Sequence, residues 1–143
     1  STENITAILC MEFALRKKLE NLEINIEKMK NIQKNLNNYF SKLNNIRILT
    51  NIENCSNYIF TFAMKKVKSE VLQRILDGYG ILIGTGSACN STKHNLRIAD
   101  ALGLSNEYKH GIVRLSFSDQ TNEEQIERFI NIFSNEYKII YSL

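Results

Sequence analysis

The chain has 143 residues, 43% hydrophobic and 23% charged, a composition typical of one globular domain with a core of its own. Lysine and arginine outnumber aspartate and glutamate by only 18 to 15, and this spread-out excess argues against a nucleic-acid-binding surface. No segment has the roughly 18 consecutive apolar residues of a membrane helix, and residues 1–20 lack the apolar centre of a signal peptide, so we expect a cytoplasmic protein without membrane contacts.

Two helices are expected first along the chain. Apolar residues recur at helical spacing over residues 4–19, with Thr2 or Asn4 as the expected N-cap. Leu22, Met29 and Leu36 follow at seven-residue intervals and predict a long amphipathic helix over about 20–43. We interpret its apolar face as packing against a sheet. The alternative, a two-stranded coiled coil, usually needs a longer repeat.

Strands and helices alternate after residue 45. Strands are predicted at 46–49, 58–62, 81–83 and 111–117, and helices at 68–77, at 96–102 with a stop at Gly103, and after a capping-box pattern at residues 121–124. Residues 84–95 are a loop by composition. This order predicts an α+β fold, a small antiparallel or mixed sheet of three to four strands covered by helices and preceded by a long amphipathic helix.

Cys89 is the strongest candidate for a reactive group. It lies in the segment Gly84-Thr85-Gly86-Ser87-Ala88-Cys89, a small, polar setting in which an exposed thiol becomes a nucleophile once deprotonated. Lys93 and His94 follow within five residues and would favour the thiolate. The alternative is a small hydrophobic side chain packed beneath a turn.

The other two cysteines are weaker candidates for a reactive group. Cys10 lies on the apolar side of the first helix, so we interpret it as a core residue. Cys55 stands in a polar turn before a strand, and we interpret it as structural. An odd number of cysteines without short repeated spacings predicts neither a disulfide framework nor a zinc site.

Arg114 interrupts a strand that is otherwise made of Ile, Val, Leu and Phe. Two interpretations stay open: an arginine on an edge or solvent face, or a guanidinium that binds a carboxylate through two parallel hydrogen bonds. His110, four residues earlier, is either a polar residue at the start of the strand or part of a site. Spacing alone does not exclude a Cys89–histidine hydrolase pair, but no protease signature surrounds Cys89.

An ordered set of motifs resembles the C-terminal part of NifS/IscS-type cysteine desulfurases, which are class-V aminotransferase-like enzymes of pyridoxal phosphate fold type I. The family pattern has a Gly-Thr-Glu-Asn start, a Thr-Gly-Ser-Ala-Cys loop, an Ala-Leu-Gly helix end, an Ile-Arg-Phe-Ser strand and a Thr-Glu-Glu helix start. The corresponding segments here are residues 1–5, 85–89, 101–104, 112–116 and 121–124. Ser1 replaces the usual glycine, and Ser118-Asp119 stands where the family often has Gly-Arg.

The resemblance implies a role for three residues. Cys89 would attack the sulfur of a cofactor-bound cysteine, which leaves alanine and a Cys89 persulfide for transfer to an acceptor protein. Arg114 would bind the substrate carboxylate, and Thr2 would contact the phosphate of the cofactor in the partner subunit of a homodimer. The pathways implied are iron–sulfur cluster assembly, thiamine synthesis or tRNA thiolation.

The resemblance also implies that the chain, residues 1–143, is a single C-terminal domain of a larger enzyme. In this family the cofactor-bearing lysine, the ring-stacking residue and the aspartate facing the pyridine nitrogen belong to a preceding large domain. We therefore expect this chain alone to bind no pyridoxal phosphate and to be inactive. The rival interpretations are a selenocysteine lyase and a standalone persulfide carrier or interaction domain.

Overall fold

The computed structural model describes residues 3–85 and 98–142. Within them, four strands form one sheet in the order β1-β2-β4-β3, namely β1 (Ile46–Ile48), β2 (Ile59–Met64), β4 (Ile112–Ser116) and β3 (Gly84–Thr85). Every neighbouring pair is antiparallel. The predicted α+β class and the small sheet are confirmed.

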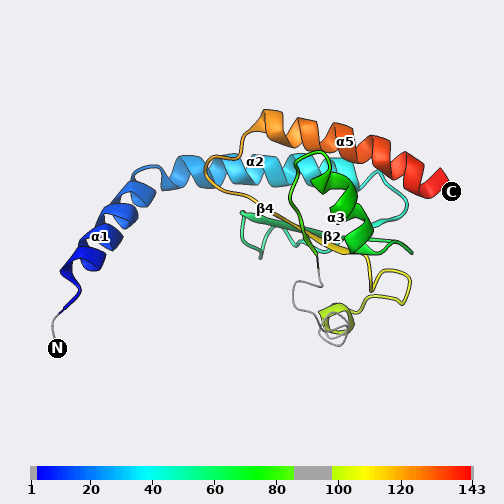
Figure 1. The fold of residues 1–143 in the computed structure, drawn as a ribbon, viewed down its shortest axis with the longest axis horizontal. Helices are drawn as coiled ribbons and strands as arrows, with labels where there is room; N and C mark the ends of the chain where they lie inside the picture. The colour runs from blue at the N-terminus through cyan, green and yellow to red at the C-terminus, as the bar shows by residue number, and fades with distance from the viewer. Residues whose placement is uncertain (1–2, 86–97, 143) are drawn as a thin grey trace.

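Three helices, α2 (Leu22–Phe40), α3 (Ser69–Asp77) and α5 (Glu123–Ser142), lie on one face of this sheet (Figure 1). The core between the layers is rich in phenylalanine. The ring of Phe40 lies 4.3 Å from that of Phe62, 5.6 Å from that of Phe60 and 5.1 Å from that of Phe133, centroid to centroid. These offset and edge-on arrangements are the favoured ones for aromatic pairs, so Phe40 joins α2, β2 and α5.

The amphipathic face of α2 packs as the sequence predicts. Met29, Ile32 and Leu36 are buried in the core with Phe40 at the end of the helix. The face is occupied by the sheet and α5 of the same chain, which confirms packing over a coiled coil. Gln33 is buried on the same helix, and its amide nitrogen donates to the carbonyls of Ser56 and Ile59 at 2.9 and 2.7 Å.

Local sequence signals place most helix ends correctly. Asn4 caps α1 (Ile5–Glu20) by accepting a hydrogen bond from the amide of Ala7 at 3.1 Å, while Thr2 lies outside the described residues. The capping box of α5 is real but shifted by one residue. Asn122 and Gln125 exchange reciprocal bonds of 2.9 and 3.1 Å, because Thr121 instead accepts from the amide of Ser118.

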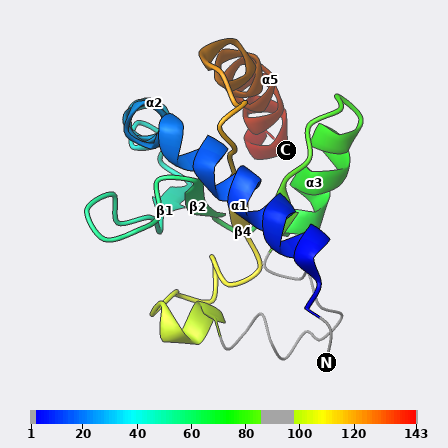
Figure 2. The same cartoon turned by 90° about the vertical axis from the view of Figure 1, so that its left-hand side faces the viewer.

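Glycine ends the helical turn at residues 98–101 as expected. Gly103 has a φ of +61°, its amide donates to Asp100, and the amide of Leu104 donates to Ala99. This pair of bonds is a Schellman motif, which needs a left-handed residue at this point. The turn lies across the sheet from α5 (Figure 2), and Ala99 and Leu104 pack there against Ala63.

The strand predicted at 81–83 is wrong. The amide of Ile81 donates to the carbonyl of Leu76 and completes the end of α3, so it is not available to a ladder. Leu82 is 85% exposed, whereas Ile83 is buried in the core. The strand β3 begins only at Gly84, and it is two residues long.

The first helix departs most from expectation. Every residue of α1 is exposed, and α1 projects past α2 (Figure 1). The core position predicted for Cys10 is therefore wrong: Cys10 is exposed and belongs to neither buried cluster of the described residues. Cys55 is also exposed and belongs to no buried cluster, so the structural role is not supported. No helix in the described ranges is long and apolar enough to cross a membrane.

Candidate active site

The face of the sheet opposite the three helices, here called the open face, carries the candidate site. Side chains alternate along β4, so Val113 and Leu115 point into the core and Arg114 points to the open face, where it is exposed. β4 is a central strand, with Thr61 of β2 and Gly84 of β3 directly opposite Arg114. One interpretation was an arginine on an edge or a solvent face. The structure excludes the edge, because β4 is paired on both sides, and it shows Arg114 exposed on the open face.

Gly84 makes room for the guanidinium of Arg114. A Cβ built on Gly84 would lie 3.3 Å from Nε and 3.4 Å from Nη2 of Arg114, and 3.3 Å from its carbonyl oxygen. The charged group therefore lies beside β3 rather than extending freely into solvent. The sequence indicated Gly84 only as a flexible residue of the loop that leads to Cys89, and its contact with Arg114 was not predicted, because that contact depends on the pairing register of two strands.

The segment that contains Cys89 is attached to β3 at one end and to the turn at residues 98–101 on the open face at the other. Residues 86–97 lie outside the described residues, so the structure does not place Cys89, Lys93 or His94. Just before them, Thr85 pairs with Val113, the neighbour of Arg114. Just after them, Ala99 packs against Ala63 and Ile112 on the open face. Both attachment points of the Cys89 segment thus adjoin the strand that carries Arg114.

The nearby carboxylates are already paired with lysines. Asp100 lies 2.7 Å from the ammonium of Lys109, and Glu107 lies 3.4 and 3.3 Å from those of Lys65 and Lys66. The hydrogen bond from Lys66 holds the pKa of Glu107 below its usual value. Across residues 3–85 and 98–142, no carboxylate forms an ion pair with Arg114. The guanidinium is therefore available to a carboxylate from outside this part of the chain.

His110 does not share the site of Arg114. It is exposed, precedes β4, and uses its carbonyl to accept from the amide of Ser69 at 2.8 Å. It ends the turn before β4, which begins only at Ile112. This placement favours the interpretation of His110 as a polar residue at the start of the strand.

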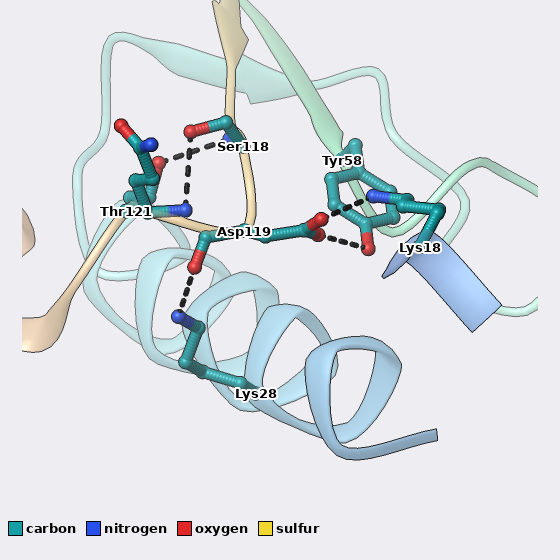
Figure 3. Close-up of polar contacts among 7 residues, drawn as sticks. Lys18, Lys28, Tyr58, Ser118, Asp119 and Thr121 are labelled. Carbon is teal, nitrogen blue, oxygen red and sulfur yellow. Dashed lines mark hydrogen bonds and ion pairs between the residues drawn. The ribbon is translucent and has the colours of Figure 1, made fainter. Parts of the chain in front are cut away.

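A polar cluster at the other end of β4 was not predicted from the sequence (Figure 3). One carboxylate oxygen of Asp119 accepts from the hydroxyl of Tyr58 at 2.7 Å, and the other pairs with Lys18 at the end of α1. The Lys28 ammonium donates to the Asp119 carbonyl at 2.5 Å. These bonds connect α1, α2 and the two turns at one end of the β2–β4 pair, where Ile59 lies opposite Ser116. The bond from Lys18, followed by that from Tyr58, lowers the pKa of Asp119.

Metal binding has no support in the described residues, in which no group of three or more His, Cys, Asp or Glu side chains is arranged to hold an ion. The open face likewise offers few ionisable groups. Its residues on β2 and β4 are Ile59, Thr61, Ala63, Ile112, Arg114 and Ser116. Arg114 is the charged member of this set, and Arg47 of β1, opposite Ala63, faces the same side, so the chemistry available there is recognition of an anion.

Comparison with curated proteins gives consistent relatives. A NifS/IcsS protein homolog of Lactobacillus delbrueckii subsp. bulgaricus is 28% identical over 145 residues, which cover 96% of this chain and 36% of the relative. A cysteine desulfurase of Nostoc sp. is 29% identical over 136 residues, 92% of this chain and 33% of the relative. The cysteine desulfurase IscS of Clostridium botulinum is 29% identical over 140 residues, which cover 92% of this chain and 34% of the relative. The chain thus spans about a third of the length of these relatives.

Solved structures share the fold. A NifS-like protein superposes with a TM-score of 0.80 at 22% identity, covering 97% of this chain and 35% of that one. A NifS-like protein from Rickettsia africae superposes with a TM-score of 0.75 at 23% identity, covering 100% of this chain and 36% of that one. The resemblance to NifS/IscS-type proteins expected from the motifs is confirmed. The aminotransferase class-V family profile matches residues 1–129, and the chain therefore belongs to the class-V aminotransferase family.

Proposed function

We propose that this chain is the C-terminal, thiol-bearing domain of a pyridoxal-phosphate-dependent cysteine desulfurase. The observation that carries the proposal is the geometry of the open face. An arginine with no carboxylate partner among the described residues lies beside the strand that leads into the Cys89 segment, and the far end of that segment returns to the same face. The arginine and both flanks of the thiol-bearing segment therefore adjoin the same strand, β4.

The proposed reaction uses Cys89 as the nucleophile. Its thiolate attacks the sulfur of L-cysteine, a new S–S bond forms, and the C–S bond of the substrate breaks. The substrate carbon gains a proton and becomes the methyl group of alanine, and Cys89 keeps the sulfur as a persulfide. One cysteine and one thiol give one alanine and one persulfide, so the atoms balance without an external oxidant or reductant. The persulfide then passes to an acceptor protein.

Arg114 would hold the substrate by its α-carboxylate. A guanidinium engages both oxygens of a carboxylate in one plane, which fixes orientation as well as position. That orientation matters because the attacking sulfur must approach the C–S bond along a defined line. Arg114 is central in the sheet, and its backbone is held by ladders on both sides, so its Cα position is rigid.

The cofactor would be held elsewhere in the enzyme. Pyridoxal phosphate acts as an electron sink and needs a lysine and an acidic partner for its ring nitrogen. The open-face residues of β2 and β4 include neither a lysine nor an acidic residue, so these two strands do not fit this group by themselves. We therefore place the cofactor in a preceding domain. Thr2 is proposed to contact its phosphate across a homodimer interface.

The first helix supports the proposal of a preceding domain. Seven large apolar side chains of α1 are 54–69% exposed: Ile5, Ile8, Leu9, Met11, Phe13, Leu15 and Leu19. They occupy more than half of the helix circumference at 100° per residue, a distribution typical of a helix buried within a larger protein. A 16-residue helix is also marginal in water without tertiary packing.

The experiment is a turnover assay on the complete polypeptide that carries this chain, with L-cysteine and pyridoxal phosphate. We expect stoichiometric alanine and a mass gain of one sulfur atom on the peptide that contains Cys89. Cys89→Ser should remove both, and Cys55→Ser, an exposed thiol outside the site, should change neither. Alanine release by the Cys89→Ser protein at the wild-type rate would contradict the proposal.

The same assay separates the rival functions. A selenocysteine lyase would turn over selenocysteine and not cysteine. A persulfide carrier would accept sulfur at Cys89 from a separate donor and would release no alanine. The 143-residue chain alone is expected to release no alanine. It should also show no visible absorbance of bound pyridoxal phosphate at stoichiometric cofactor, and either signal would contradict the placement of the cofactor in a preceding domain.

A further inference from the structure

We infer that Gly84 is a positioning residue for substrate binding, because the side chain it lacks leaves the space in which the guanidinium of Arg114 rests. The inference rests on the proposed role of Arg114 as the carboxylate-binding group. It adds a residue that touches no substrate and acts through Arg114.

The register of the sheet puts the two residues directly opposite each other. Gly84 and Arg114 are Cα partners in the antiparallel β3–β4 pair. In such a pair, opposite side chains point to the same face and their Cβ atoms lie about 4.5–5.5 Å apart. A side chain at position 84 would therefore compete with Arg114 for the same part of the open face.

The strand on the other side of β4, β2, restricts where the guanidinium of Arg114 can lie. Thr61 of β2 is the second Cα partner of Arg114, and it carries a half-buried, β-branched side chain on the same face. The contacts at Gly84 place Nε and Nη2 of Arg114 on the β3 side. The charged group thus inclines away from Thr61 and toward the strand that continues into the Cys89 segment.

A Cβ at position 84 would require Arg114 to shift by a few tenths of an ångström. Its three nearest atoms are Nε, Nη2 and the carbonyl oxygen of Arg114, at 3.3, 3.4 and 3.3 Å. The carbonyl belongs to a central strand that is paired on both sides, so it moves less easily than the side chain, although a shift of a few tenths of an ångström is enough. The side chain of Arg114 is the flexible neighbour and yields first. Glycine otherwise weakens a strand, so nothing in strand stability favours glycine at this position.

The test compares Gly84→Ala and Gly84→Ser with wild type in the complete enzyme. Loss of one of two charge-assisted hydrogen bonds corresponds to about a tenfold change in affinity. We expect KM for L-cysteine to rise about tenfold in Gly84→Ala and kcat to change less than about twofold, since Cys89 is untouched. The melting temperature should stay the same or rise, because alanine is the better strand residue. A merely structural role would instead lower the melting temperature together with kcat.

The second arm combines Gly84→Ala with Arg114→Lys. Lysine lacks the planar guanidinium group that a side chain at position 84 would move. Gly84→Ala should therefore leave the KM of the Arg114→Lys enzyme unchanged within about twofold. Full additivity of the two effects would overturn the inference, because independent sites add. An unchanged KM in the single Gly84→Ala variant would overturn it as well.

A crystal structure of the Gly84→Ala enzyme tests the positioning role of Gly84 separately from the proposed function. We expect the guanidinium of Arg114 to shift away from residue 84 by at least a few tenths of an ångström, whereas an unmoved guanidinium would overturn the positioning role whatever the activity. If the guanidinium moves but the wild-type enzyme does not desulfurate cysteine, the proposed function fails. The control Gly78→Ala, at the end of α3 and remote from β4, should change neither KM nor the place of Arg114.

Discussion

Tyr58 donates a hydrogen bond to Asp119 at 2.7 Å, and this bond joins the turn before β2 to the turn after β4. The ammonium of Lys18 lies 4.9 Å from the centre of the Tyr58 ring and pairs with the same carboxylate. Lys18 is also one of the last residues of α1. The cluster therefore attaches the end of an otherwise unpacked helix to the sheet.

The first prediction concerns the pH dependence that Asp119 contributes. Hydrogen bonds from Lys18 and Tyr58 hold the pKa of its carboxyl below the usual value. A lowered pKa in the folded state adds stability that is present above the unfolded pKa of about 4 and is lost as pH falls through the folded value. Asp119→Asn should therefore lower the urea midpoint at pH 7 and converge with wild type in acid.

The control for that measurement is Asp77→Asn, an exposed carboxylate at the end of α3 that joins no ion pair among the described residues. Its urea midpoint should follow wild type at each pH. If the deficit of Asp119→Asn were the same at pH 7 and below pH 3, the ionised carboxylate would not be the source of the stabilisation.

The second prediction concerns Gly111, which touches the backbone of Met64. A Cβ at Gly111 would lie 2.1 Å from the carbonyl oxygen and 2.8 Å from the nitrogen of Met64, and the Met64 amide donates to the Gly111 carbonyl at 2.9 Å. Gly111→Ala must separate β2 from β4 and should cost about 3 kcal/mol of unfolding free energy. Gly78→Ala should stay within about 1 kcal/mol of wild type, and equal losses would contradict this account.

The third prediction distinguishes α1 from the core by two matched substitutions. Leu9 of α1 is 61% exposed, whereas Leu36 of α2 is fully buried. In the 143-residue chain, Leu9→Ala should change the unfolding free energy by less than about 0.5 kcal/mol, and Leu36→Ala should cost about 2–5 kcal/mol. In the complete polypeptide, Leu9→Ala should also become costly, because a preceding domain would cover α1. A Leu9→Ala effect that stays small there would contradict that covering.

The fourth prediction concerns Tyr141, whose hydroxyl donates to the carbonyl of Lys65 at 2.8 Å. Burial raises the pKa of this phenol to about 12. A raised pKa in the folded state gives stability that is complete below the unfolded value of about 10 and is lost as pH rises toward 12. Wild type should therefore lose about 1–2 kcal/mol more than Tyr141→Phe between pH 10 and 12. Parallel denaturation profiles of the two proteins would refute the assignment.

Local chemistry explains why much of this fold could be predicted from the sequence. The cap at Asn4, the left-handed Gly103 and the apolar face of α2 depend on neighbours within a few residues, and the structure confirms all three. The strand at 81–83 failed because Ile81 completes the end of α3. An apolar triplet does not reveal whether its amides are already bonded elsewhere.

The sequence by itself determined the family, the α+β order of elements and the candidates Cys89, Arg114 and Thr2, because motifs and periodicity are properties of the linear chain. Only the tertiary structure decided that Arg114 lies in the centre of the sheet on the open face, and that Cys10 is exposed. It also showed that Gly84 leaves space for a guanidinium thirty residues away along the chain. These features depend on strand register and on what covers each surface, and neither follows from the spacing of residues in the sequence.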